Sequence, residues 1–283
     1  MLVELAVGDA YGAGFEFRNP LYVRAFNRVD RHRRPALTLS GGGQYTDDTQ
    51  MTIAITEAIL SNEPWTPKLI AAHFVRAFQR DPRTGYAPRF YRFLRSVDNA
   101  QDFCTRIRPT SDRSGAAMRA GPVGLHSDIG AVLERAEIQA RVTHDTEAGV
   151  ASAQAAALMV HHFARRDGTP GDLADFVAQH VCGPWQEPWR GRVSMRGMDC
   201  VRAAITATAQ SASLKQLLHR CVAFGGDVDT VATIALAAGS WSPHHTPDLP
   251  ESLIEGLERS EFGYDYLRAL DGQLIEHMKL DTR

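Results

Sequence analysis

Two short acidic stretches of this sequence have the residue types and spacing that bind hard divalent cations. In one of them, Asp227 and Asp229 stand two residues apart and Thr230 follows, between a glycine pair and a long apolar run. A tight turn entering a helix would direct these three oxygen-bearing side chains toward one point. Oxygen ligands suit Mg²⁺, Ca²⁺ or Mn²⁺, whereas zinc would call for cysteine or histidine. The simpler alternative is that one aspartate caps the helix that begins near Val231.

The second stretch has the same make-up, with glycines before it, threonine and aspartate oxygens in the middle and a helix after it. Two such helix starts could meet in an all-helical core. Six oxygen donors exceed what one ion leaves room for beside a substrate, and they fit two metal ions about 3.5–4 Å apart. The alternative is that both stretches are ordinary N-caps whose acids complement the helix dipole. The six candidate metal ligands are Thr46, Asp47, Asp48, Asp227, Asp229 and Thr230.

Two other metal-dependent classes fit the sequence less well. The pair Asp47-Asp48 suggests an aspartate-rich isoprenoid-diphosphate site, but Met51 stands where a third aspartate is expected. The doublets His144-Asp145 and His161-His162 suggest a phosphohydrolase of the HD type, but the upstream histidine of that class is not evident.

Helical periodicity dominates the elements that must position these residues, and alternating β patterns are scarce. Residues 18–44 are expected to be loop-like. Without repeats, linkers or composition shifts, the sequence predicts an all-α fold in a single compact domain over 1–283. We expect helices over residues 2–13, 46–63, 67–80, 89–97, 128–141, 143–166, 173–181, 201–209 and 231–238, and one or two more within 251–278.

Composition narrows the class of partner. With 31 Lys and Arg against 33 Asp and Glu, the net charge of -2 argues against a nucleic-acid groove, although it leaves room for a small basic patch. The four cysteines lie far apart without metal-ligand spacing, so reduced and mostly buried thiols are expected. No segment approaches the roughly 18 apolar residues of a membrane span. We therefore expect a soluble, cytoplasmic protein with no membrane partner.

Five motifs in order resemble the ADP-ribosylglycohydrolase family, which includes dinitrogenase-reductase-activating glycohydrolases and bacterial immunity hydrolases. They lie at Gly8–Glu16, Thr46–Thr49, Ser114–Arg119, Thr143-His144 and Gly226–Thr230. The resemblance implies an orthogonal all-α fold with two Mg²⁺ ions, or Mn²⁺ in some members. It assigns one ion to Thr46, Asp47 and Asp48 and the other to Asp227, Asp229 and Thr230, with Asp229 bridging.

The resemblance also implies roles around these ions. Glu16 matches an acidic residue that acts as base in some members. A carboxylate near two cations stays ionised, so it could accept a proton. Considered without the resemblance, Glu16 is interpreted as an exposed acidic residue of a loop. Asp81 falls where some relatives carry an acidic residue near the leaving group, although a turn-initiating aspartate before proline explains it equally well. Four rings either line the adenine or the modified side chain or form a helix core face, namely Tyr86, Phe90, Tyr91 and Phe93.

The segment from Ser114 through Gly115 and Ala116 to Met118 resembles the loop that holds the diphosphate of ADP-ribose. Glycine there lets the backbone come close and offers N–H donors. Ser114 stands where many relatives have asparagine, and Met118 on its own would more often be a core residue. His144 falls where the family places a histidine near the distal ribose or phosphate, while a structural histidine is the alternative.

These features predict hydrolysis of the bond between ADP-ribose and a modified protein side chain, with ADP-ribose as product. The metal ions would bind the ribose hydroxyls and position a water, and nearby carboxylates would stabilise an oxocarbenium-like state. One alternative is a hydrolase of the same fold acting on modified nucleic acid or a free ADP-ribose derivative. Another is an inactive ADP-ribose-binding or structural relative. The acceptor is not readable from the sequence, and loops 18–40 and 81–114 are expected to decide it.

Overall fold

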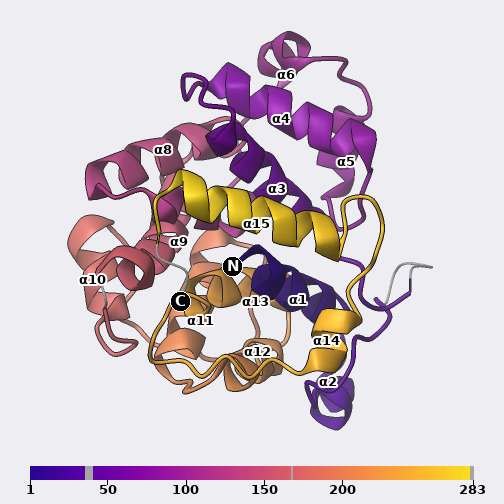
Figure 1. Cartoon of the computed structure of the whole chain (residues 1–283), viewed down its shortest axis with the longest axis vertical. Helices are drawn as coiled ribbons and strands as arrows, with labels where there is room; N and C mark the ends of the chain where they lie inside the picture. Colours follow the sequence, from indigo (N-terminus) through magenta and orange to yellow (C-terminus); the bar gives the residue numbers. More distant parts are fainter. Residues whose placement is uncertain (36–40, 167, 281–283) are drawn as a thin grey trace.

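The computed structural model describes residues 1–35, 41–166 and 168–280, and these ranges form helices joined by loops, without a β-strand (Figure 1). The all-α prediction is therefore confirmed. In chain order the helices are α1 (Leu2–Ala13), α2 (Pro20–Phe26), α3 (Asp47–Leu60), α4 (Pro67–Arg80), α5 (Pro88–Leu94), α6 (Ala100–Arg106), α7 (Gly115–Met118), the 3-10 helix η1 (Gly121–Leu125), α8 (Ile129–Arg141), α9 (Glu147–Arg166), α10 (Leu173–His180), α11 (Gly197–Ala209), α12 (Leu214–Ala223), α13 (Val228–Gly239), α14 (Glu251–Glu255) and α15 (Tyr264–His277).

Helix α13 lies at the centre, buried along its whole length, with α1 beside it and α15 crossing in front of α1 and α3 (Figure 1). Two glycines allow α1 to approach this closely. A Cβ at Gly12 would lie 2.4 Å from the Cα of Asp229, and one at Gly8 would lie 2.8 Å from the carbonyl oxygen of Ala232. The small residues of α1 therefore bring the backbones of the two helices into direct contact.

A turn that only glycine adopts easily leads into α13. Gly225 and Gly226 have φ angles of 69° and 96°, in the left-handed region that disfavours residues with a Cβ. A Cβ at Gly226 would also lie 1.9 Å from the carbonyl oxygen of Val193. This turn sets the direction in which the first residues of α13 enter the core.

Several loop predictions are wrong. The stretch 18–44 contains α2, which Asn19 caps by accepting from the Leu21 N–H, while residues 36–40 lie outside the described residues. Helices α6 and α12 lie where no helix is predicted. A single domain over residues 1–283 stays a prediction.

The cysteines are free, as predicted, but only Cys200 and Cys221 are buried; Cys104 and Cys182 are exposed, so their predicted burial is wrong. Across the ranges that the structure describes, no helix combines the length and apolar character needed to cross a membrane.

Candidate metal centre

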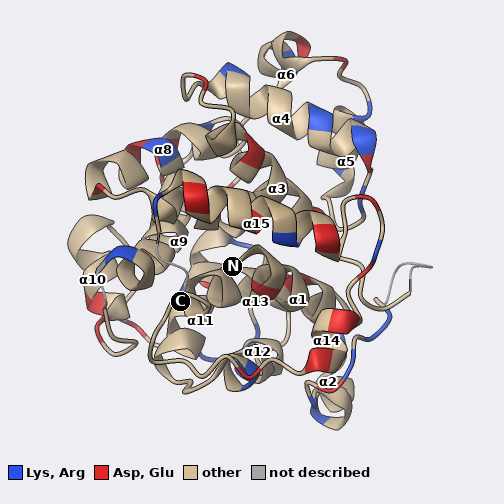
Figure 2. Cartoon of the chain, viewed as in Figure 1, with Lys and Arg blue, Asp and Glu red and all other residues tan. Residues whose placement is uncertain are grey.

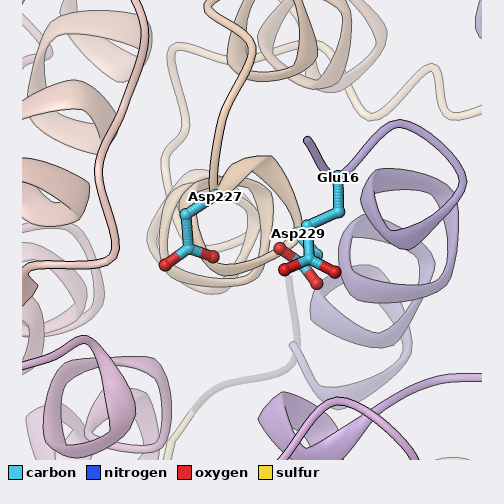
Figure 3. A group of neighbouring side chains, drawn as sticks. All are labelled: Glu16, Asp227 and Asp229. Carbon is cyan, nitrogen blue, oxygen red and sulfur yellow. The ribbon is translucent and has the colours of Figure 1, made fainter. Parts of the chain in front are cut away.

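The starts of α3 and α13 face each other, and the loop after α1 adds a further acidic residue. One carboxylate oxygen from each of Glu16, Asp227 and Asp229 lies within 4.8 Å of the others. Figure 3 shows the two aspartates projecting from the start of α13, with Glu16 reaching the same space from the neighbouring segment. Side chains from the two ends of the sequence thus converge on one point.

The acidic start of α3 joins the same group. Thr46 Oγ1 lies 3.3 Å from Asp48 Oδ2, and the Thr230 side chain hydrogen-bonds Asp48. Asp48 Oδ1 is buried without a hydrogen-bond partner. A buried carboxylate oxygen without a donor is unfavourable unless a cation meets it. The six predicted ligands are therefore neighbours, and one of their atoms is free to bind a cation.

The electrostatics of the cluster call for added positive charge. Burial raises the pKa of each aspartate, and the charges of neighbouring carboxylates raise the values for Asp47, Asp48 and Asp229 further. Burial and the charges of Asp227 and Asp9 raise the pKa of Glu16 to about 7. Among the described residues, no lysine or arginine forms an ion pair with any of them. An all-oxygen donor set with this unbalanced charge fits divalent cations such as Mg²⁺.

Asp9 is a functional residue that the sequence reasoning did not single out. It is fully buried in α1. Its carboxylate accepts from the N–H of Thr46 at 2.9 Å and the hydroxyl at 2.8 Å, and from the Thr49 N–H at 3.0 Å and hydroxyl at 2.6 Å. Four donors fix the start of α3 against α1. The available signal was an aspartate on the buried, otherwise small and apolar face of a helix.

The capping alternative explains only one of the two helix starts. Thr46 caps α3 through its side chain. Asp227 stands at the N-cap position of α13 without a side-chain cap bond. Its Oδ2 instead accepts from the Ser114 hydroxyl at 3.1 Å and from the Cys200 thiol at 3.5 Å. The carboxylate of Asp227 is therefore oriented toward the cluster, and Ser114 contacts the acidic centre.

The predicted diphosphate loop lies against the predicted histidine. A Cβ at Gly115 would lie 2.9 Å from Cε1 and 3.2 Å from Nε2 of His144. Ala116 and Met118 are buried, and their carbonyl oxygens accept from Gln139 Nε2 and the Thr52 hydroxyl. The structure thus joins Gly115 and His144 in one place, while Ala116 and Met118 contribute packing beneath it.

A buried hydrogen-bond chain determines which nitrogen of His144 carries the proton. Arg119 Nη2 donates to the Thr143 hydroxyl oxygen at 2.8 Å. That hydroxyl lies 2.7 Å from His144 Nδ1, and because Nδ1 is the acceptor that the described structure offers to the Thr143 hydroxyl, we assign its proton to the bond with Nδ1. Burial and the Arg119 charge lower the pKa of His144 to about 3. The imidazole is therefore neutral, with its N–H on Nε2, beside Gly115.

Asp81 is held in an ion pair. Its carboxylate accepts from Arg83 Nε at 2.8 Å, and Arg83 also pairs with Glu258. The same loop supports α3, because the Thr84 carbonyl accepts from the Asp47 N–H at 3.0 Å. Asp81 is not one of the carboxylates that converge with Glu16. The loop therefore contacts the cluster through its backbone, and the carboxylate of Asp81 lies outside the cluster.

The four rings after this loop make core contacts. Tyr86 and Tyr91 pack edge-on against Phe78, and Phe93 packs on Phe103. The Tyr86 hydroxyl donates to Gln50 Oε1 at 2.7 Å. These contacts match the helix-core alternative.

The HD-type alternative lacks a site in the described ranges. Asp145 pairs with Arg141, and a nitrogen of His161 bonds the Gly124 carbonyl. Of the described residues, those grouped for metal binding are Glu16 and the aspartates of α13, with no histidine among them.

Comparison with known proteins agrees with this fold and cluster. A family model for ADP-ribosylglycohydrolase matches residues 1–282. The ADP-ribosyl-[dinitrogen reductase] glycohydrolase of Rhodospirillum rubrum is 28% identical over 272 residues, which cover 90% of this chain and 87% of the relative. ADP-ribosylhydrolase ARH3 of Homo sapiens is 22% identical over 319 residues, covering 90% and 88%.

A solved structure described as an ADP-ribosylglycohydrolase-related protein complex shares the fold. Its TM-score is 0.77 at 20% identity, and the match covers 98% of this chain and 96% of that one. The chain therefore belongs to the ADP-ribosylglycohydrolase family. It is accordingly an enzyme that hydrolyses ADP-ribose linkages.

Proposed function

We propose that this enzyme releases ADP-ribose from a modified side chain of another protein and that it does so with two divalent cations held between α3 and α13. The observation that carries this proposal is the convergence of buried carboxylates from both helix starts without a compensating basic residue among the described residues. The printed names of the relatives support an ADP-ribosyl substrate, and the Rhodospirillum rubrum enzyme is named for a protein that carries it.

The donor set favours Mg²⁺, with Mn²⁺ as the other candidate, because all six proposed ligands offer oxygen. Thr46, Asp47 and Asp48 would hold one ion, and Asp227, Asp229 and Thr230 the other. When bound, the ions would supply Lewis acidity toward the ribose hydroxyls and an attacking water. Asp9 would keep the α3 ligands in place through its four hydrogen bonds.

Glu16 is the better candidate for the general base. Its carboxylate converges with those of α13, whereas Asp81 is neutralised by Arg83. A base must reach the attacking water, and its pKa should lie near the working pH. Burial and neighbouring carboxylates raise the pKa of Glu16 to about 7, and bound cations would lower it and keep the group ionised.

The remaining predicted residues would orient the ADP-ribose. The loop at Gly115 would offer backbone N–H groups to the diphosphate, which requires close backbone approach. His144 would donate from Nε2 to a phosphate or ribose oxygen, because Thr143 occupies Nδ1. Ser114 would link this loop to the cluster through Asp227.

The test measures ADP-ribose release from arginine-linked, serine-linked and threonine-linked ADP-ribosyl peptides, and from an ADP-ribosylated oligonucleotide, with Mg²⁺, Mn²⁺ or EDTA. We expect turnover of a peptide that requires metal and is lost in Asp48→Asn and Asp229→Asn, with circular dichroism verifying that both variants fold. Full turnover in EDTA, or undiminished turnover in both variants, would refute the two-cation proposal. Turnover of the oligonucleotide alone would refute the protein substrate.

A further inference from the structure

A basic cavity adjoins the acidic centre on the side of Glu16. It has a volume of about 340 Å³ and is rimmed by Arg18, Arg24 and Arg192, over a floor that includes Val23 and Phe224. Phe17 stands between Glu16 and Arg18 in the sequence. Its N–H donates to the carbonyl of Gly226 at 3.0 Å, and Gly226 directly precedes Asp227. This backbone contact joins the segment that carries Arg18 to the turn that leads into α13 and its carboxylates.

The three guanidinium groups are available for an anion. None of them forms an ion pair with a described residue. Arg18 Nε is buried and has no hydrogen-bond partner in the described structure. Aromatic rings support two of the groups: Arg18 lies 4.9 Å from the Tyr22 ring centre and Arg192 lies 5.6 Å from that of Phe17. Arg18 Nη2 donates to the Arg34 carbonyl at 3.1 Å, which fixes that guanidinium group further. Arg24 and Arg192 make no hydrogen bond or ion pair in the described structure, so their N–H groups can bind a carboxylate or phosphate.

Large hydrophobic side chains are exposed on the chain segments that carry the three arginines. The large hydrophobic residues that are exposed in the described ranges are Phe17 at 42%, Leu21 at 74%, Phe26 at 40% and Met195 at 41%. Three of them belong to the α2 region. Met195 borders the cluster, since its carbonyl accepts from the Ser114 N–H at 3.0 Å. Aromatic residues, methionine and arginine are the types enriched in protein interfaces.

We infer that this cavity binds an acidic side chain of the modified protein, next to the residue that carries the ADP-ribosyl group. The inference rests on the proposed function and deepens it, because it assigns an acceptor preference to the same site. A carboxylate side chain beside the modified residue would extend past Phe17 and pair with Arg18, Arg24 and Arg192. Neighbouring apolar residues of the substrate would cover Leu21 and Phe26.

A polypeptide fits this surface better than a nucleic acid does. Three arginines line one cavity, and along the ribbon in Figure 2 the positions of basic and acidic residues are interspersed rather than gathered into the continuous basic run that a phosphate backbone favours. Of the exposed hydrophobic residues, leucine and methionine offer a base no ring for stacking, and the rings of Phe17 and Phe26 already lie against the guanidinium groups of Arg192 and Arg33.

The experiment compares two ADP-ribosyl peptides that share the linkage turned over in the first assay and differ only by Glu or Gln on both sides of the modified residue. We expect kcat/KM for the Glu peptide to exceed that for the Gln peptide about tenfold, as charge-assisted hydrogen bonds imply. The double variant Arg24→Gln/Arg192→Gln should bring the ratio close to one. Arg28→Gln, which removes an exposed arginine outside the cavity lining, should retain the full ratio.

A binding assay distinguishes a failure of the proposed function from a failure of the inference about the cavity. The unmodified Glu peptide, fluorescently labelled, should bind the wild-type protein and lose affinity about tenfold in the double variant. Failure to hydrolyse either modified peptide would overturn the proposed function. Equal turnover of both peptides, or a Glu preference that survives the double variant, would overturn this inference alone. Displacement of the labelled peptide by single-stranded DNA at lower concentration than by the unlabelled Glu peptide would also overturn it, in favour of a nucleic-acid partner.

Discussion

Gly12→Ala tests whether the contact between α1 and α13 holds the centre together. The added Cβ would lie 2.4 Å from the Cα and 2.8 Å from the backbone nitrogen of Asp229. Carbon atoms pack at about 3.5–4.0 Å, so the helices would have to separate locally by about 1 Å. Backbone atoms cannot relieve the overlap by changing rotamer. Overpacking of this kind costs about 1–3 kcal/mol, against about 1 kcal/mol gained in helix propensity.

We therefore expect Gly12→Ala to lower the free energy of unfolding by about 1–2 kcal/mol. Because Asp229 would move, we also expect the substitution to lower the affinity for Mg²⁺. Urea unfolding in EDTA measures the stability, and ADP-ribose release against Mg²⁺ concentration measures the metal affinity. Gly272→Ala is the matched control, since it also lies within a helix but its Cβ would meet nothing within 4 Å; it should stabilise the protein by about 1 kcal/mol. A Gly12→Ala protein with wild-type stability and wild-type Mg²⁺ dependence would show that this account of the helix contact is wrong.

Three further predictions follow from the charges and hydrogen bonds. Asp229→Asn should raise the melting temperature in EDTA, by on the order of 1 kcal/mol in stability, because it removes a buried charge among like charges, and it should abolish stabilisation by Mg²⁺; a lower melting temperature in EDTA would contradict this. Thr143→Val should shift the proton of His144 toward Nδ1 in ¹⁵N NMR spectra and reduce turnover about tenfold, while Thr143→Ser keeps both; an unchanged tautomer would rule out the hydroxyl as its cause. Although burial opposes it, the nearby His73, whose Nδ1 lies 3.7 Å away, and hydrogen bonds from Arg80 and Tyr266 lower the pKa of Glu57 from 4.5 to about 2. Its charge therefore stabilises the fold above pH 4.5, and this contribution disappears as the pH falls toward 2. Acid unfolding of Glu57→Gln should therefore lack about 2 kcal/mol of pH dependence in that window, after discounting for solvent screening, and a wild-type profile would disprove the assignment.

The long helices and the meeting of the two acidic stretches were predictable because both depend on local pattern. Apolar spacing marks α4 and α9, and the doubling of threonine and aspartate marks the starts of α3 and α13. Helix α12 carried a readable signal that was missed, with Ser213 as its N-cap and Leu214, Leu217 and Leu218 on its buried face.

Other features depend on tertiary contacts that one sequence does not reveal. Helix α2 is only seven residues long and mostly exposed, so it has no periodic pattern of apolar residues from which it could be predicted. The role of Asp9 depends on the position of α3, and Cys200 became a neighbour of Asp227 only through the packing of α11 against α13. The pairing of Asp81 with Arg83 separates its carboxylate from Glu16 in a way that the turn sequence alone does not show.

The direct contact between α1 and α13 also determines when the centre can come into being as the chain folds. Asp9 and the start of α3 lie near the N-terminus, whereas Asp229 belongs to α13, so a nascent chain presents no complete ligand set until α13 has emerged. Pairing segments so far apart in sequence is slow, because loop closure must precede the gain in contacts. Cation capture should therefore be among the last events of folding, and a chain truncated before α13 would have no centre at which to bind metal.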